Sequence, residues 1–138
     1  SSIERKNNIQ VIGMPSWENF KEIQHKNYAE IPIFYPSAFY IPIGNKWATT
    51  FDNRFRNVMG VKTSATAYKA FELTYYFAKL LIKYGKITVF NLDNPQFKVM
   101  TDFEFLPIKY NPRENTPDYF ENKRIYFLRR LNGVVTEQ

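Results

Sequence analysis

The sequence predicts an α+β fold, in which a mainly antiparallel sheet is covered on one side by a long central helix and a C-terminal helix. Three observations predict this class. Residues 66–85 carry polar side chains at helical spacing, residues 86–90 and 97–110 have strand character, and residues 121–133 again show helical spacing. At 138 residues the chain is long enough to close a hydrophobic core.

The chain is expected to form one domain with a short lead-in. Residues 1–14 are polar and are predicted to be partly extended, and residues 15–138 are assigned to a single α+β domain. Within it, residues 45–60 are predicted to be an insertion loop with at most one short helical turn.

Prolines mark the first two regular elements. Pro15 and Ser16 are placed to begin a helix that would bury Trp17. Residues 31–43 follow, with three prolines among apolar and aromatic residues. Because proline cannot donate to a strand ladder, this density fits a strand only at a sheet edge or at a bulge. We therefore expect either an edge strand, which could pair with another chain, or a strand broken by a bulge.

The strongest helix prediction covers residues 66–85, and Gly85 is a typical residue for ending it. Nearly all side chains outside one narrow polar stripe are apolar, and the stripe spans about 100° of a helical wheel. A stripe this narrow predicts that the broad apolar face packs over a sheet. The stripe consists of Lys69, Glu72, Tyr76, Lys79, Lys83 and Lys86.

The remaining chain is expected to form two strands, a polar loop and a closing helix. Residues 86–90 and 97–110 are the strands, joined by a turn, and residues 111–122 are the loop. The stretch 121–133 is predicted to be a helix with an apolar side that includes Leu128. Its opposite side would carry Lys123, Tyr126, Arg129 and Arg130.

Composition narrows the class of protein. Cysteine is absent, which excludes disulfides and thiolate metal sites, and no apolar run approaches the roughly 20 residues of a membrane span. Lys and Arg number 19 against 13 acidic residues, and this formal net charge of +6 favours a polyanionic partner such as nucleic acid. The many Phe, Tyr, Lys, Asn and Ile residues are typical of an AT-rich coding sequence, which points to an organelle genome, a virus or a low-GC bacterium.

The residues that common catalytic sites need are not gathered in the sequence. His25 is the only histidine and is expected to be solvated, so no histidine-based metal site or Ser-His-Asp relay is assembled. Asp102 and Glu104 share a face of a predicted strand, which we interpret as a solvent-facing edge. We therefore expect no catalysis, no metal, no cofactor and no small-molecule substrate.

The basic residues are the candidate functional group. Such cations bind RNA phosphates, and the rings of Trp47 and Phe55 would stack on unpaired bases. The alternatives are a solvated surface for the closing helix, and core packing for Trp47 and Phe51. The candidate RNA-binding residues are Lys46, Arg54, Arg56, Lys62, Lys79, Lys83, Lys86, Arg113, Lys123, Arg129 and Arg130.

Short motifs across residues 17–131 are similar to those of the large-subunit ribosomal protein five family. In that family the first strand starts at a Val-Pro pair and ends near a Gly-Val-Gly sequence. Ile31-Pro32 and Gly44 lie at a matching separation in this chain. Tyr76–Phe90 matches the end of the family's long helix and the strand after it. Gln96–Met100 matches its Phe-Lys-Ile-Arg strand, and Arg124–Leu131 matches its closing helix.

The resemblance implies a fold and a set of partners. Residues 31–43, 86–91 and 96–110 would form one sheet, with the long helix and the closing helix packed on the same side. Residues 45–60 look like an insertion relative to the family. The hairpin tip, basic in the family and directed at the peptidyl-site tRNA, is residues 91–96 and has no cation here, which argues against a tRNA contact.

Three functional hypotheses follow. The first is a non-catalytic structural constituent of the large ribosomal subunit that binds ribosomal RNA and neighbouring ribosomal proteins, with no membrane contact. Its expected location is the mitochondrion, with the cytoplasm or a virion as alternatives. The second is an aromatic-rich structural or assembly subunit of a virion or multiprotein complex that binds no nucleic acid. The third is a phage or plasmid nucleic-acid-binding module, although no helix-turn-helix pairing is apparent in the sequence.

Overall fold

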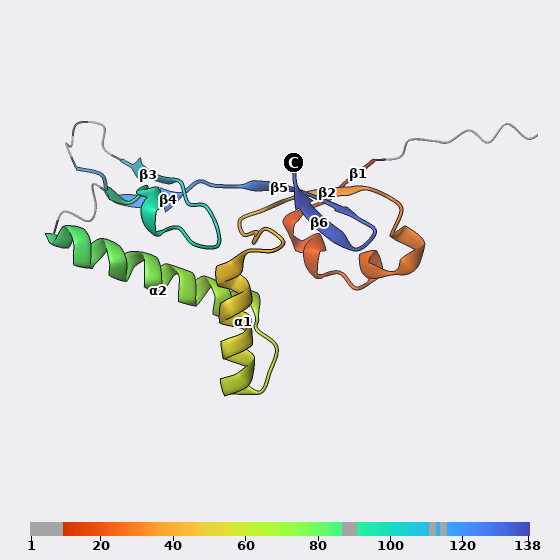
Figure 1. Ribbon diagram of the computed structural model, residues 1–138. Coiled ribbons are helices and arrows are strands. Elements are labelled where there is room, and N and C mark those ends of the chain that lie inside the picture. The colour runs from red at the N-terminus through yellow and green to blue at the C-terminus, as the bar shows by residue number, and fades with distance from the viewer. Residues whose placement is uncertain (1–9, 87–90, 111–112, 114–115) are drawn as a thin grey trace, which may run out of the picture. The chain divides into compact units, whose positions relative to one another are not determined.

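The chain divides into two compact units, and each is described by itself. The first unit combines Ser1–Tyr40 with Ile125–Gln138, and the second is Ile41–Arg124. The described residues contain two α-helices, a mixed four-stranded sheet and a two-stranded hairpin, so the α+β class is confirmed. The computed structural model (Figure 1) describes residues 10–86, 91–110, 113 and 116–138.

The first unit is built on a sheet with the strand order β1-β2-β5-β6. β1 and β2 run parallel, and the other neighbours are antiparallel. Side chains alternate across the sheet, and one face forms the core from Ile33, Tyr35, Tyr126 and Leu128. The strands are β1 (Val11–Ile12), β2 (Ile33–Ser37), β5 (Tyr126–Leu131) and β6 (Val134–Glu137).

Short 3-10 helices replace the helix predicted from Pro15. Trp17 packs against the core of the sheet, as predicted, and so does Ile23, whereas Phe20 is exposed. Pro15 does begin the first of these helices. They are η1 (Pro15–Asn19), η2 (Glu22–Gln24) and η3 (Lys26–Tyr28).

β2 lies inside the sheet, so the edge strand predicted from its prolines is wrong. The carbonyl of Pro32 accepts from the N–H of Val11 at 3.2 Å, and that of Phe34 accepts from Gly13 at 2.7 Å. The backbone N–H and C=O groups of the even-numbered residues of β2 therefore point toward β1. Pro36 has the same orientation but lies beyond the end of the two-residue β1, where no N–H is needed.

The closing stretch forms a β-hairpin, and the predicted C-terminal helix is wrong. β5 and β6 are joined by Asn132 and Gly133, whose φ angles are 52° and 76°, and Leu131 pairs with Val134. Two successive positive φ angles define a type I′ turn, for which Asn-Gly is a preferred sequence. Gly133 therefore forms a turn between strands and ends no helix.

The second unit has a different core, formed by α2 and by the segment that runs from residue 92 to the start of β3. Its central buried side chains are Tyr76, Leu80 and Phe103. Its elements are α1 (Lys46–Met59), α2 (Ala65–Tyr84), η5 (Pro95–Phe97), β3 (Phe105–Ile108) and β4 (Tyr119–Asn122).

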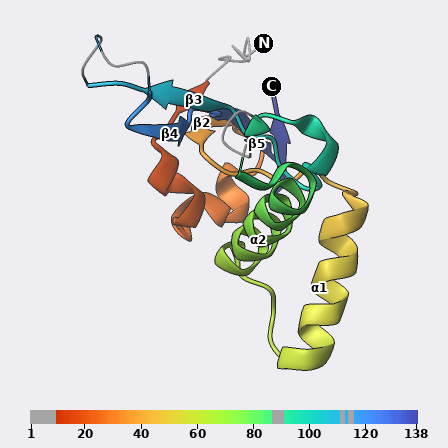
Figure 2. The same cartoon turned by 90° about the vertical axis from the view of Figure 1, so that its left-hand side faces the viewer.

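The predicted insertion loop 45–60 is helix α1 instead. The side-chain oxygen of Asn45 accepts the N–H of Ala48 at 3.0 Å and so caps the first turn. Gly60, with a φ of 68°, ends the helix in the left-handed conformation that glycine adopts without strain. Figure 2 shows α1 beside α2, with a short connection between them.

Aromatic rings join the two helices. Phe51 stacks on Phe71 with 4.5 Å between ring centroids, and Trp47 lies 5.2 Å from Tyr75. Such ring pairs stabilise packing beyond the area that they bury. Phe51 therefore packs between the helices and is half-buried there, which favours the packing alternative for this residue.

α2 follows its predicted range, but it buries the opposite face from the one expected. Glu72, Tyr76 and Leu80 are buried, whereas Leu81 and Ile82 are exposed, Ile82 to 81%. Two members of the polar stripe, Glu72 and Tyr76, are internal because they find partners there, whereas its lysines remain exposed. The Tyr76 hydroxyl donates to the carbonyl of Leu92 at 2.6 Å.

The strands of the second unit do not form the predicted sheet. β3 covers only four residues of the stretch 97–110, and it pairs with β4 from the predicted loop 111–122. The predicted strand 86–90 lies largely outside the described residues. Residues 33–37 pair in the first unit, so they do not share a sheet with residues 96–110 as the family resemblance implies.

Candidate nucleic-acid interface

Positive charge is concentrated in one segment of the second unit. We call residues 45–86 the helical hairpin, since they comprise α1, the connection, α2 and the residues next to its end. The helical hairpin has eight cations and two carboxylates, so its formal net charge of +6 equals that of the entire chain. The cations are Lys46, Arg54, Arg56, Lys62, Lys69, Lys79, Lys83 and Lys86.

Both carboxylates of the helical hairpin are engaged internally. Asp52 forms an ion pair with Arg56 at 2.9 Å. Glu72, only 1% exposed, accepts hydrogen bonds from the backbone N–H groups of Met100 and Thr101, each at 2.7 Å. Neither carboxylate is therefore free to neutralise the remaining cations or to repel an approaching phosphate.

The cations of α1 and of the connection point to solvent. Lys46, Arg54 and Lys62 are exposed, and none of them lies within ion-pair distance of a carboxylate among the described residues. Residues two apart on a helix lie about 160° apart around its axis. Arg54 and Arg56 therefore point in different directions, and Arg56 is the one paired with Asp52.

The predicted stacking residues differ in their surroundings. Phe55 is half-buried and packs with its ring centre 5.7 Å from that of Phe51 on the same helix, so its ring is partly covered. Trp47 contacts Tyr75 but remains 45% exposed. Of the two, Trp47 retains the more open ring.

Two of the α2 lysines are held beside aromatic rings. The Lys79 ammonium lies 5.6 Å from the centre of the Tyr75 ring, and that of Lys83 lies 5.1 Å from the Tyr84 ring. Lys83 also donates to the side chain of Gln96. These contacts leave both lysines exposed while limiting their motion, which lowers the entropy cost of binding a phosphate.

The other predicted RNA-binding residues lie outside the helical hairpin. Lys123 is paired with Glu121 at 2.6 Å, and Arg113 is exposed and has internal contacts. Arg129 and Arg130 belong to β5 of the first unit, where alternation places them on opposite faces of the sheet. The prediction that both arginines point away from the core is therefore wrong for Arg130.

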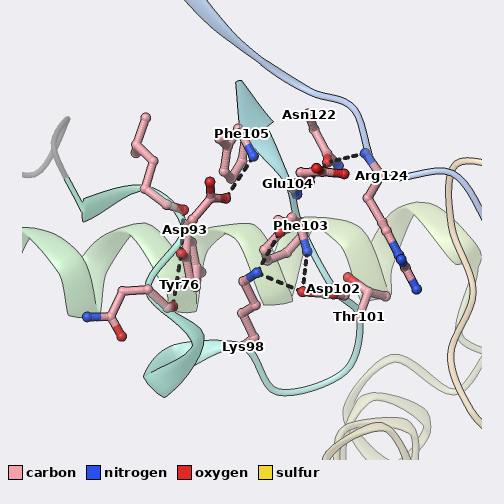
Figure 3. A network of polar contacts seen from close by, with 12 residues as sticks. Tyr76, Asp93, Lys98, Thr101, Asp102, Phe103, Glu104, Phe105, Asn122 and Arg124 are labelled. Atoms are coloured by element: carbon pink, nitrogen blue, oxygen red, sulfur yellow. Dashed lines mark hydrogen bonds and ion pairs between the residues drawn. The ribbon is translucent and has the colours of Figure 1, made fainter. Parts of the chain in front are cut away.

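A polar network orders the segment that packs against α2 (Figure 3). Lys98 forms an ion pair with Asp102 at 2.6 Å, and this hydrogen bond lowers the pKa of Asp102 below its ordinary value. Asp102 also accepts from the N–H of Phe103. Burial raises the pKa of Tyr76 to about 12, so its hydroxyl stays protonated and can donate.

The same network corrects the interpretation of the strand-like carboxylates. Asp102 and Glu104 precede β3 rather than forming a strand edge. Asp93 accepts from the N–H of Phe105 at 2.8 Å, and the side chain of Asn122 accepts from the N–H of Glu104 at 3.0 Å. Asp93 and Asp102 therefore act as backbone acceptors that fix this loop over α2.

Lys69 is a candidate residue that the sequence-based choice of RNA-binding residues omitted. It lies in α2 within the helical hairpin and is exposed, with an internal contact. A count of charged residues in each segment of the chain includes Lys69 among the candidate RNA-binding residues, whereas a search for short motifs does not. The same count would have separated this segment from the remainder of the chain, in which 11 cations balance 11 carboxylates.

No protein-family model, curated protein or solved structure matches this chain. In the part of the chain that the structure describes, no helix is long and apolar enough to span a membrane. The described residues also contain no group of His, Cys, Asp and Glu side chains arranged to hold a metal ion.

The two arginines of β5 are expected to respond differently to substitution. Arg130 lines a cavity of about 230 Å³ together with Trp17, Tyr35 and other core side chains. Arg130→Gln removes packing of its apolar stem and is expected to lower the free energy of unfolding by about 1 kcal/mol. Arg129→Gln, on the open face, is expected to stay within about 0.5 kcal/mol of the parent. Urea denaturation measures both, and equal effects would contradict the strand assignment of these side chains.

Proposed function

We propose that this protein is a non-catalytic RNA-binding constituent of a ribonucleoprotein, and that the helical hairpin contacts RNA phosphates. One observation carries the proposal. The helical hairpin holds the entire net charge of the chain, while both of its carboxylates are engaged in internal contacts. An uncompensated cationic surface favours a polyanion, since binding releases counterions from the nucleic acid.

Aromatic side chains favour RNA among polyanions. Trp47 is partly exposed on α1, near Tyr75 and Lys79 of α2. RNA displays unpaired bases that stack on such rings, whereas an acidic membrane surface does not. Cations and open rings on the same two helices therefore suit RNA.

The sequence resemblance favours the large ribosomal subunit as the particular ribonucleoprotein. The partners would then be ribosomal RNA and ribosomal proteins, and the location would be mitochondrial. This finer part of the proposal is supported by motif spacing alone. Residues 33–37 form a strand but pair in another sheet than that family's pattern implies, and residues 126–131 form a strand in place of its closing helix. The proposal of RNA binding therefore depends on the charge of the helical hairpin and not on the resemblance.

A salt titration of RNA binding tests the proposal. Replacing Arg54 and Lys62 by glutamine removes two exposed cations without touching the core. For each phosphate that is no longer bound, the slope of log K against log salt is expected to fall by about 0.7–0.9, with little change in melting temperature. The binding measurement uses the full chain and a structured RNA at several salt concentrations.

A matched variant controls for net charge. Lys21→Gln with Lys26→Gln removes the same charge from exposed positions of the first unit. This variant is expected to keep the parent slope. Equal reductions in slope in both variants, or RNA binding no tighter than DNA binding at moderate salt, would contradict the proposal, and tighter binding to duplex DNA would favour a DNA-binding module.

A second candidate, an assembly subunit without nucleic-acid binding, is favoured by the open face of the first unit's sheet. Ile12, Phe127 and Val134 are exposed there, on the face opposite the core. Exposed apolar side chains of this kind are typical of protein interfaces. Binding through them would respond little to salt, so the same titration distinguishes the two candidates.

A further inference from the structure

We propose that the helical hairpin holds an unpaired nucleobase of its RNA ligand in an apolar hollow on α2, an inference that rests on the proposed function. The hollow is open to solvent and has a volume of about 440 Å³. It is lined by Ala70, Phe71, Thr74, Tyr75 and Ala78.

The hollow arises from residue size along one side of α2. Ala70, Thr74 and Ala78 are four residues apart, so they lie one above another on the helix surface. Their small side chains leave this strip recessed, and Phe71 and Tyr75 rise beside it. The result is an open hollow with small side chains as its floor and two aromatic rings along one side, a surface on which a planar base can lie.

The aromatic sides of the hollow are held in place by α1. Phe71 stacks on Phe51 at 4.5 Å, and Tyr75 lies 5.2 Å from Trp47. Rings that are fixed by neighbours give up little freedom when a ligand stacks on them. The hollow is therefore formed before the base arrives.

Charge selects a nucleotide over an apolar protein segment as the occupant. The Lys79 ammonium lies 5.6 Å from the centre of the Tyr75 ring, so a base against Tyr75 brings its own phosphate near this cation. Glu72 and Asp52, the carboxylates of the two helices, are engaged internally. The hollow thus combines stacking surface with a positive charge and without a repelling one.

Only unpaired bases can use such a site. In a duplex the base faces are covered by their stacked neighbours, whereas bases in loops and bulges can turn outward onto aromatic side chains. The helical hairpin is therefore expected to bind a looped or single-stranded RNA more tightly than a duplex of equal length. Base–aromatic stacking predicts a preference of about ten- to hundredfold.

Filling the hollow tests the inference. Thr74 and Thr50 are both exposed threonines within helices, but only Thr74 lines the hollow. Thr74→Leu is expected to abolish the preference for looped RNA over duplex, and RNA binding itself is expected to persist through the other cations of the helical hairpin. Thr50→Leu is the matched control and is expected to retain the preference, and thermal melting of both variants verifies that they fold.

The outcomes separate this inference from the proposed function. RNA binding without a preference for looped RNA, or a preference that survives Thr74→Leu, overturns the nucleobase site and leaves phosphate binding by the helical hairpin intact. A change in sedimentation on Thr74→Leu, with RNA binding unaffected, overturns it in favour of a second copy or protein partner on this face. Absence of RNA binding in the parent protein overturns the proposed function itself.

Discussion

Replacing Glu72 with alanine is expected to lower the free energy of unfolding by about 3–5 kcal/mol. The buried carboxylate accepts from the N–H groups of Met100 and Thr101 at 2.7 Å and from the Thr101 hydroxyl at 2.6 Å. Alanine leaves these donors without their partner in the interior, and each unsatisfied buried donor costs about 1–3 kcal/mol. Urea denaturation, followed by a probe of helix content, measures the destabilisation.

Glutamine at the same position provides the matched comparison. Glu72→Gln keeps one side-chain oxygen that can accept from both backbone N–H groups, and its amide can donate to the Thr101 hydroxyl. Its expected cost is therefore about half that of alanine, since shape and most hydrogen bonds survive. An alanine variant destabilised by less than about 1 kcal/mol would show that the carboxylate does not anchor residues 100–101 to α2.

Glu72 also shows why the length of α2 could be predicted from the sequence but its buried face could not. Helical spacing and Gly85 define the extent of the helix, because both act locally. A helical wheel assigns polar side chains to solvent, and it carries no information about a distant segment that supplies donors. The partners of Glu72 are 28 and 29 residues away, so only tertiary structure reveals that this side chain is internal.

Two other elements differ from their predictions although the sequence carries local signals for them, namely α1 and the closing hairpin. Asn45 and Gly60 flank α1 as its N-cap and its left-handed end, so the caps of this helix were visible before its core contacts. Asn132-Gly133 lies between two apolar runs and is a strong signal for a hairpin. The closing stretch was assigned to a helix because its apolar residues fit a wheel, although Tyr126 and Leu128 also alternate as a strand requires.

The candidate RNA site also has one part that the sequence predicts and one part that only the tertiary structure reveals. Its cations are visible in the sequence, and counting them by segment locates the helical hairpin. The hollow on α2 is not visible, since it depends on α1 holding Phe71 and Tyr75 in place from another part of the chain. Residue type therefore indicates the chemistry of the ligand, and packing between the helices determines where its base would lie.

Replacing Leu128 with alanine is expected to lower the free energy of unfolding by about 2–5 kcal/mol, as for the removal of a large aliphatic side chain from a core. Leu128 is 1% exposed in β5, between Tyr35 of β2 and Glu137 of β6. Its neighbours on the core face, Tyr35 and Tyr126, are held by the backbone pairing of the strands and close the resulting cavity only in part.

Phe127 supplies the control that distinguishes a strand from a helix. In β5 it points to the opposite face and is 65% exposed, so Phe127→Ala is expected to change the free energy of unfolding by less than about 1 kcal/mol. In a helix, residues 127 and 128 would share the apolar side, and both substitutions would be severe. A large effect at Leu128 with a small one at Phe127 is therefore expected from the alternation of β5, and comparable destabilisation at both positions would contradict it.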